Sequence, residues 1–225
     1  ATTLAREAAR RALALDHRQA EALSVLGRIR MIYDRDWPGA DEDLAQAAAL
    51  EPPSADAGLA YGQLLSAVGR HDEAVAMLQR ARRRDPLRRE TLEHLGLSLW
   101  MADQPDRALT ALADAAAIEP TARRPHFRRM VVLDQLGRHA EAMDERAIWL
   151  DLFEEPAVAT HLAALTRDGN HRGAMNEWIA MLERLSQWFE AAIQYMVIDD
   201  PGGALPALER AVAERADNAP FLAQF

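Results

Sequence analysis

The chain has 225 residues, a formal net charge of −9 and no cysteine. The acidic excess argues against a general nucleic-acid binder, which needs surplus cations to meet phosphate groups. The lack of cysteine excludes disulfides and thiolate metal sites and fits a reducing, cytoplasmic location. No apolar run reaches the ~18 residues that a membrane-spanning helix needs. Because Ala, Leu, Arg and Glu dominate and β-branched residues are scarce, the composition favours helices over sheet.

In chain order, the spacing of apolar residues predicts thirteen helices joined by short turns. Asp36, Asp72 and Asp106 lie at or near the starts of three of them, where a carboxylate caps free backbone N–H groups and meets the positive end of the helix dipole. The predicted helices span residues 3–16, 18–33, 37–50, 54–68, 71–84, 88–102, 105–117, 122–136, 139–153, 156–168, 171–184, 186–198 and 201–215.

Four sets of residues recur every 34 residues along the chain. The first sign is the pair of stretches "GRHDEA" and "GRHAEA", which begin at Gly69 and Gly137. Four independent sets with one period indicate a structural repeat. The sets are Ala40, Ala74, Ala108 and Ala142; Leu44, Leu78 and Leu112; Ala47, Ala81 and Ala115; and Pro52, Pro86 and Pro120.

This period resembles the tetratricopeptide repeat (TPR) family, most clearly over Ala55–Pro86, where Gly62 takes the small position of the first helix. The resemblance implies an all-α fold: a right-handed superhelical solenoid of about six helix-turn-helix units plus an N-terminal orphan helix. The pattern drifts where residues 27–40 carry one extra residue, where Met130 replaces the expected Gly, and where Trp149 replaces the expected Ala. One solenoid is predicted over residues 1–225: an orphan helix at 3–17, units at 18–53, 54–86, 87–120, 121–156, 157–185 and 186–215, and a tail at 216–225.

The stretch that begins "MIYDRDWPGADEDLAQAAALEP" at Met31 is similar to the TPR region of bacterial winged-helix or adenylate-cyclase-type multidomain regulators. The closing segment "ALPALERAVAERADNAPFLAQF" is similar to the end of the same regions. This resemblance implies a bacterial, cytoplasmic regulator of which the chain is the C-terminal part. The opening, which reads as the middle of a helix, also indicates a fragment of a longer protein.

No catalytic or ligand motif accompanies the seven histidines. His71 and His139 fall in turns between helices and are expected to be solvated, and the H-E-x-x-H, P-loop and G-x-S-x-G patterns are all missing. We therefore predict a protein that is not an enzyme, with no catalytic residue, no metal site and no cofactor.

The TPR resemblance implies that a peptide or protein segment binds in a concave groove lined by the first helices. Helical spacing predicts an apolar stripe in the C-terminal half of that groove, with Trp100 and Phe127 as its anchors. The alternative is that a tight superhelix buries some of these side chains. The predicted lining is Arg28, Leu59, Gln63, Glu93, Leu97, Trp100, Arg124, Phe127, Val131, Phe189 and Ile193.

A run of arginines between the second and third units, "QRARRRDPLRRE", suggests a patch for an anionic partner formed by Arg83, Arg84, Arg88 and Arg89. The alternative is that these arginines cap helix ends and pair with nearby carboxylates. The partner is predicted to be a protein or peptide, with no nucleic acid and no membrane. Two other functions stay open: a small-ligand sensor using an apolar groove pocket, and a scaffold that self-associates through the solenoid ends.

Overall fold

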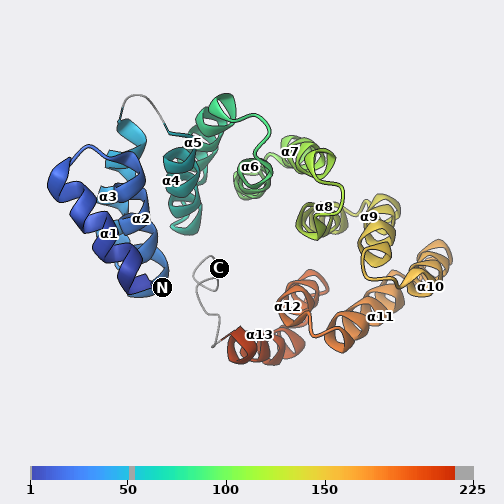
Figure 1. Ribbon diagram of the computed structural model, residues 1–225. Helices are drawn as coiled ribbons and strands as arrows, with labels where there is room; N and C mark the ends of the chain where they lie inside the picture. The colour runs from blue at the N-terminus through green and yellow to red at the C-terminus, as the bar shows by residue number, and fades with distance from the viewer. Residues whose placement is uncertain (1, 51–53, 216–225) are drawn as a thin grey trace. The chain divides into compact units, whose positions relative to one another are not determined.

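A computed structural model describes residues 2–50 and 54–215 (Figure 1). All regular structure in the described residues is helical, as predicted, and no described helix is long and apolar enough to cross a membrane. The α-helices are α1 Thr2–Leu15, α2 Ala20–Ile29, α3 Trp37–Ala49, α4 Ala55–Ala67, α5 His71–Arg84, α6 Arg89–Met101, α7 Pro105–Ile118, α8 Arg123–Gln135, α9 His139–Asp151, α10 Pro156–Arg167, α11 His171–Arg184, α12 Trp188–Val197 and α13 Pro201–Arg215.

The described residues divide into two compact units, the first ending at residue 118 and the second running from 119 to 215. The first contains α1 and the hairpins α2–α3, α4–α5 and α6–α7, and the second contains the hairpins α8–α9, α10–α11 and α12–α13. Within the first unit, the first helices of successive hairpins also contact each other, α2 against α4 and α4 against α6. We call the surface formed by these three helices the first-helix face. The repeat position Pro52 and the predicted tail 216–225 lie outside the described residues.

The residues that recur every 34 positions form the core of the hairpins. Ala40, Ala74, Ala108 and Ala142 are all 0 % exposed, and the recurring leucines are buried equally well. Gly62 of α4 faces Leu78 of α5, where a Cβ atom would stand only 2.5 Å from the leucine Cγ. The same close approach joins Gly96 to Leu112, with a corresponding distance of 2.6 Å. Glycine therefore permits the two helices of a hairpin to approach until the leucine lies on the backbone of its partner.

The extra residue in the first repeat is accommodated by a π-helical turn. Residues Arg30–Asp34 form this turn at the end of α2 and are followed by Arg35 in the left-handed conformation with φ 55°. A π turn holds one more residue than an α turn, so the next helix starts in register. Asp36 then caps α3 by accepting a hydrogen bond of 3.0 Å from the backbone N–H of Gly39.

The hairpin α8–α9 changes the repeat pattern in its core. Met130 replaces the glycine, and Arg146, 34 residues after Leu112, replaces the leucine. Arg146 is only 3 % exposed and forms an ion pair with Asp134, which is also buried. Its guanidinium also lies 2.9 Å from the sulfur of Met175 and 5.7 Å from the ring centre of Trp178. A charged side chain thus occupies a position that is apolar in the first three hairpins.

Candidate functional site

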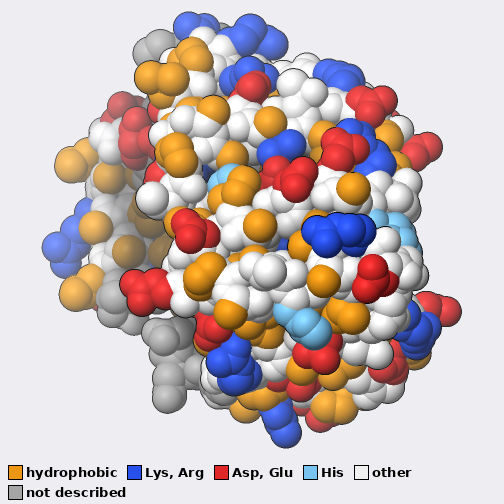
Figure 2. Space-filling view, turned by 90° about the vertical axis from the view of Figure 1, so that its right-hand side faces the viewer, with side chains coloured by type: hydrophobic (Ala, Val, Ile, Leu, Met, Phe, Trp, Pro, Cys, Tyr) orange, Lys and Arg blue, Asp and Glu red, His pale blue; other side chains and the backbone are white. Residues whose placement is uncertain are grey.

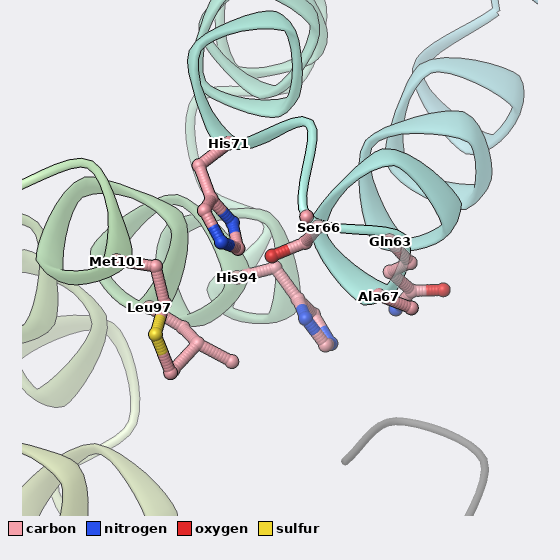
Figure 3. Close-up of a pocket in the computed structure, with 8 residues that line it drawn as sticks. Gln63, Ser66, Ala67, His71, His94, Leu97 and Met101 are labelled. Atoms are coloured by element: carbon pink, nitrogen blue, oxygen red, sulfur yellow. The ribbon is translucent and has the colours of Figure 1, made fainter.

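A pocket of about 300 Å³ lies between α4 and α6 on the first-helix face, at the turn that leads from α4 into α5 (Figure 3). It lies wholly within the first unit. Its lining consists of Gln63, Ser66, Ala67, Gly69, His71, His94, Leu97 and Met101.

The local sequence explains why these side chains converge. Gln63, Ser66 and Ala67 follow the helical i, i+3, i+4 spacing and therefore share one face of α4. Gly69 adopts φ +80°, a conformation that glycine tolerates, and this reverses the chain after α4. Because α5 begins at His71 directly after this turn, the imidazole reaches into the pocket from above α4 and α6 (Figure 3).

The two helices contribute equivalent repeat positions. Gln63 and Leu97 are separated by 34 residues, as are Ala67 and Met101, so the pocket is formed by matching positions of adjacent hairpins. The two helices are tied together beside it by a hydrogen bond of 3.1 Å from the Ser98 hydroxyl to the Ser66 hydroxyl. A pocket of this kind is a property of the repeat interface rather than of one helix.

The pocket combines apolar walls with polar groups and contains no acidic residue and no arginine in its lining. The Nδ1 atom of His71 is buried and has no hydrogen-bond partner among the described residues. His94 is 6 % exposed, whereas Met101 is 50 % exposed. A buried ring nitrogen without a partner is energetically unfavourable.

Two predicted groove residues line this pocket, and two others are buried in the core instead. Gln63 and Leu97 belong to the lining. Leu59 and Glu93 are 4 % and 0 % exposed, so the prediction that they line an open groove is wrong. Leu59 packs in the cluster between α4, α5, α6 and α7, and Glu93 is held against Arg89 one helical turn earlier.

Trp100 and Arg28 are predicted groove residues that lie outside the pocket. The indole of Trp100 is half-buried against the same apolar cluster as Leu59. Arg28 is exposed on α2. Their roles in binding stay predictions.

The apolar stripe predicted for the second unit is largely core. Phe127 is 6 % exposed, and Val131 and Ile193 pack against the same cluster. The physical reason is that α8 and α12 contact each other, so the facing apolar side chains cover one another. Phe127 is therefore not an exposed anchor. Phe189 is half-buried and Arg124 is exposed, and their predicted roles are not tested.

Two of the four arginines predicted to bind an anionic partner are paired with carboxylates of the protein itself. Arg88 is paired with Asp56, and Arg89 is paired with Glu93 and with Glu90, the latter at 2.8 Å. Arg83 and Arg84 are exposed at the end of α5. On the face shown in Figure 2, acidic and basic side chains of the described residues are interspersed. Any anionic-partner site would therefore depend mainly on Arg83 and Arg84.

His71, His94 and Met101 line the pocket but are not among the predicted groove residues. His71 was expected to be solvated because its repeat position falls in a turn, yet it is half-buried in the pocket. His94, Leu97 and Met101 lie at i, i+3 and i+7 of α6, a spacing that places them on one face. This spacing in the sequence could have indicated that His94 and Met101 share the face of Leu97. Among the described residues, no group of three His, Asp or Glu side chains is arranged to hold a metal ion.

Comparisons with known proteins agree with this architecture. Residues 31–90, which include α4 and α5 of the pocket, match a family model described as tetratricopeptide repeat. These findings support the TPR family. A search of curated proteins finds no match.

Solved structures extend the likeness in fold over most of the chain. The crystal structure of MamA is 24 % identical over 68 % of this chain and 88 % of its own, with a TM-score of 0.59. YrrB, described as a TPR protein with an unusual peptide-binding site, is 17 % identical over 97 % of this chain and 96 % of its own, with a TM-score of 0.58. At these identities the likeness shows the fold alone, and neither match points to an enzyme family.

Proposed function

We propose that this chain is a non-enzymatic protein-interaction module that binds a peptide or protein segment on the first-helix face of the first unit. The pocket between α4 and α6 would anchor the segment. The observation that carries the proposal is this pocket, which is formed by matching positions of adjacent hairpins and is open at Met101. The peptide-binding TPR protein YrrB, which shares the fold, supports it.

The site favours a peptide over the two alternatives. A pocket of about 300 Å³ is at the lower end of the range for small-molecule sites, which suits one side chain of a longer segment better than a whole ligand. Self-association through the solenoid ends has no comparable feature in its support among the described residues. We extend the proposal, on the sequence resemblance alone, to a cytoplasmic bacterial regulator in which this module would pass a binding event to an output domain.

A peptide-display selection tests the proposal. Random peptides would be selected on the wild-type protein, and their affinities would then be measured for two variants with matched changes. Met101→Arg places a charge at the mouth of the pocket, whereas Leu136→Arg places one on a 38 % exposed leucine just after α8, in the other unit. We expect Met101→Arg to weaken binding roughly tenfold or more, because an unpaired guanidinium would be desolvated, and Leu136→Arg to leave binding unchanged.

Thermal unfolding of both variants would establish that they remain folded. Peptides that bind Met101→Arg as tightly as the wild type would refute the first-helix face as the binding site. Selected peptides that are weakened by Leu136→Arg alone would move the site to the second unit.

A further inference from the structure

We infer that His139 and His171 together form a binding site for a divalent transition-metal ion in the second unit. The centres of their imidazole rings lie 4.4 Å apart, and the ring planes are inclined by 31°. His139 is the first residue of α9 and His171 is the first residue of α11, so an ion bound by both would join two successive hairpins. The inference is independent of the peptide site, which lies in the first unit.

The repeat explains why the two histidines occupy equivalent places. The stretches "GRH" and "GNH" end at His139 and His171. In both, the glycine has a positive φ, 71° at Gly137 and 78° at Gly169, which reverses the chain before the second helix of the hairpin. His139 was expected to be a solvated turn residue, and no metal site was predicted, because a separation of 32 residues matches no metal-ligand motif.

A buried carboxylate orients the ring of His139. The Nδ1 atom of His139 lies 3.4 Å from an oxygen of Asp134, whose side chain is 2 % exposed and paired with Arg146. Histidines that bind metals usually place their other ring nitrogen against such a carboxylate, which fixes the tautomer and the ring orientation. Because Nδ1 faces a buried group while the side chain of His139 is 38 % exposed, the edge of the ring that carries Nε2 faces solvent.

The spacing of the two rings suits a shared ion. Two nitrogens that each bind one zinc ion at about 2.0–2.1 Å are at most about 4 Å apart. Ring centres 4.4 Å apart bring the ring edges within this range, and the inclined planes converge on one side. His171 is exposed, so its ring can rotate and present either nitrogen to the ion. Water would fill the remaining coordination positions, as it does in open zinc sites.

The nitrogen ligands and the local charge determine which ions fit. The charge of Asp134 is balanced by Arg146, and both histidines lie at the amino-terminal ends of helices, which are positive. Mg²⁺ and Ca²⁺ are therefore disfavoured, because they need oxygen ligands and are held mainly by charge. Neutral imidazole suits zinc, nickel and copper, and affinity at one site is highest for Cu²⁺. We expect Cu²⁺ to bind more tightly than Ni²⁺ or Zn²⁺.

Calorimetric titration of the metal-free protein with Cu²⁺, Ni²⁺, Zn²⁺ or Mg²⁺ measures these affinities, at a pH above the ordinary titration range of histidine. His171→Ala removes an exposed side chain, so the variant should remain folded. We expect it to bind Zn²⁺ roughly tenfold or more weakly, because the second imidazole no longer adds intramolecularly to the first. His161→Ala is the matched control, since it removes an exposed histidine of α10 in the same hairpin, and it should leave the affinity unchanged.

NMR locates the ion without relying on a variant. Paramagnetic Cu²⁺ broadens the signals of nearby nuclei, so the imidazole C–H signals of His139 and His171 should disappear together, before those of His161. Thermal unfolding gives a third measurement. Zn²⁺ should raise the melting temperature of the wild type, because an ion that binds only the folded chain stabilises it, and should raise that of His171→Ala less.

Several results would overturn the inference. His171→Ala that binds Zn²⁺ as tightly as the wild type, or His161→Ala that loses as much affinity as His171→Ala, would remove the histidine pair as the site. Mg²⁺ that binds as tightly as Zn²⁺ would indicate carboxylate ligands instead. No detectable binding of any of the transition metals at millimolar concentration would exclude the site altogether. The peptide site is tested separately, by the affinity of display peptides for Met101→Arg.

Discussion

Replacing Arg146 by leucine should destabilise the second unit, although leucine is the residue that the repeat pattern expects there. In the first three hairpins the equivalent residues are Leu44, Leu78 and Leu112, each at most 1 % exposed. Arg146 is as deeply placed, and its burial lowers the pKa of the guanidinium while the carboxylate of Asp134 acts in the opposite direction. The side chains of Arg146 and Asp134 are 4 % and 2 % exposed. Each buried charge is therefore compensated by its partner and not by water.

The magnitude follows from what Arg146→Leu leaves behind. Among the described residues, the buried carboxylate of Asp134 would keep only the Nδ1 atom of His139 as a side-chain partner, 3.4 Å from its oxygen. Breaking a buried ion pair by removing one partner typically costs about 3–5 kcal/mol. The double variant Asp134→Ala, Arg146→Leu removes both charges, and we expect it to lie within about 1 kcal/mol of the wild type or above it, since apolar replacements of buried pairs are often neutral or stabilising.

Urea unfolding followed by circular dichroism measures these differences. Arg82→Leu is the matched control, because Arg82 also lies on a second helix and pairs with Asp114 at 2.8 Å, but both side chains are more than 40 % exposed. That change should cost less than about 1 kcal/mol. If Arg146→Leu costs no more than Arg82→Leu, or if the double variant is no more stable than Arg146→Leu, the pair is not the buried, mutually dependent unit described here.

Two further substitutions test the packing of the first unit. Gly62→Ala should lower the free energy of unfolding by about 1–2 kcal/mol, because the new methyl group overlaps Leu78 and overpacking outweighs the gain in helix propensity. Gly202→Ala is the control, because Gly202 is exposed in the first turn of α13 and an added Cβ atom would make only an ordinary contact there. This change should be neutral or stabilising in the same urea titration. Trp100→Ala should cost about 2–3 kcal/mol, less than a fully buried tryptophan, and leave peptide affinity unchanged. A loss of affinity without a loss of stability would place Trp100 on the binding face.

The fold of the hairpins was predictable because the repeat has a simple physical cause. Two helices of this length cannot bury their apolar sides alone, so they approach each other closely and stack on the next pair. Close approach requires small residues where the backbones meet, and these are the alanines and glycines that recur every 34 residues. The same reasoning located the irregular first repeat, where one extra residue is taken up by the π turn at Arg30–Asp34.

The binding surface was less predictable, because helical spacing shows which side of a helix a residue occupies but not what covers it. Gln63 and Val131 occupy equivalent repeat positions, 68 residues apart. Gln63 lines a pocket, whereas Val131 packs into the core of the second unit, where α8 meets α12. The contact between α8 and α12 depends on the packing angles of all the helices between them. A short stretch of sequence does not determine these angles together.

The departures from the pattern were visible in the sequence, but their consequence was not. The three hairpins that keep the glycine–leucine pair belong to the first unit, and α8–α9, where both positions change, opens the second. Polar residues then enter the core: the buried carboxylate of Glu145 accepts a hydrogen bond from Arg129 and lies 2.7 Å from Nδ1 of His126. Such pairs are directional, whereas leucine packed on glycine tolerates small rotations. We infer that the exchange of an apolar contact for ion pairs at this hairpin makes the packing of α8 against α9 more directional than the packing within the earlier hairpins.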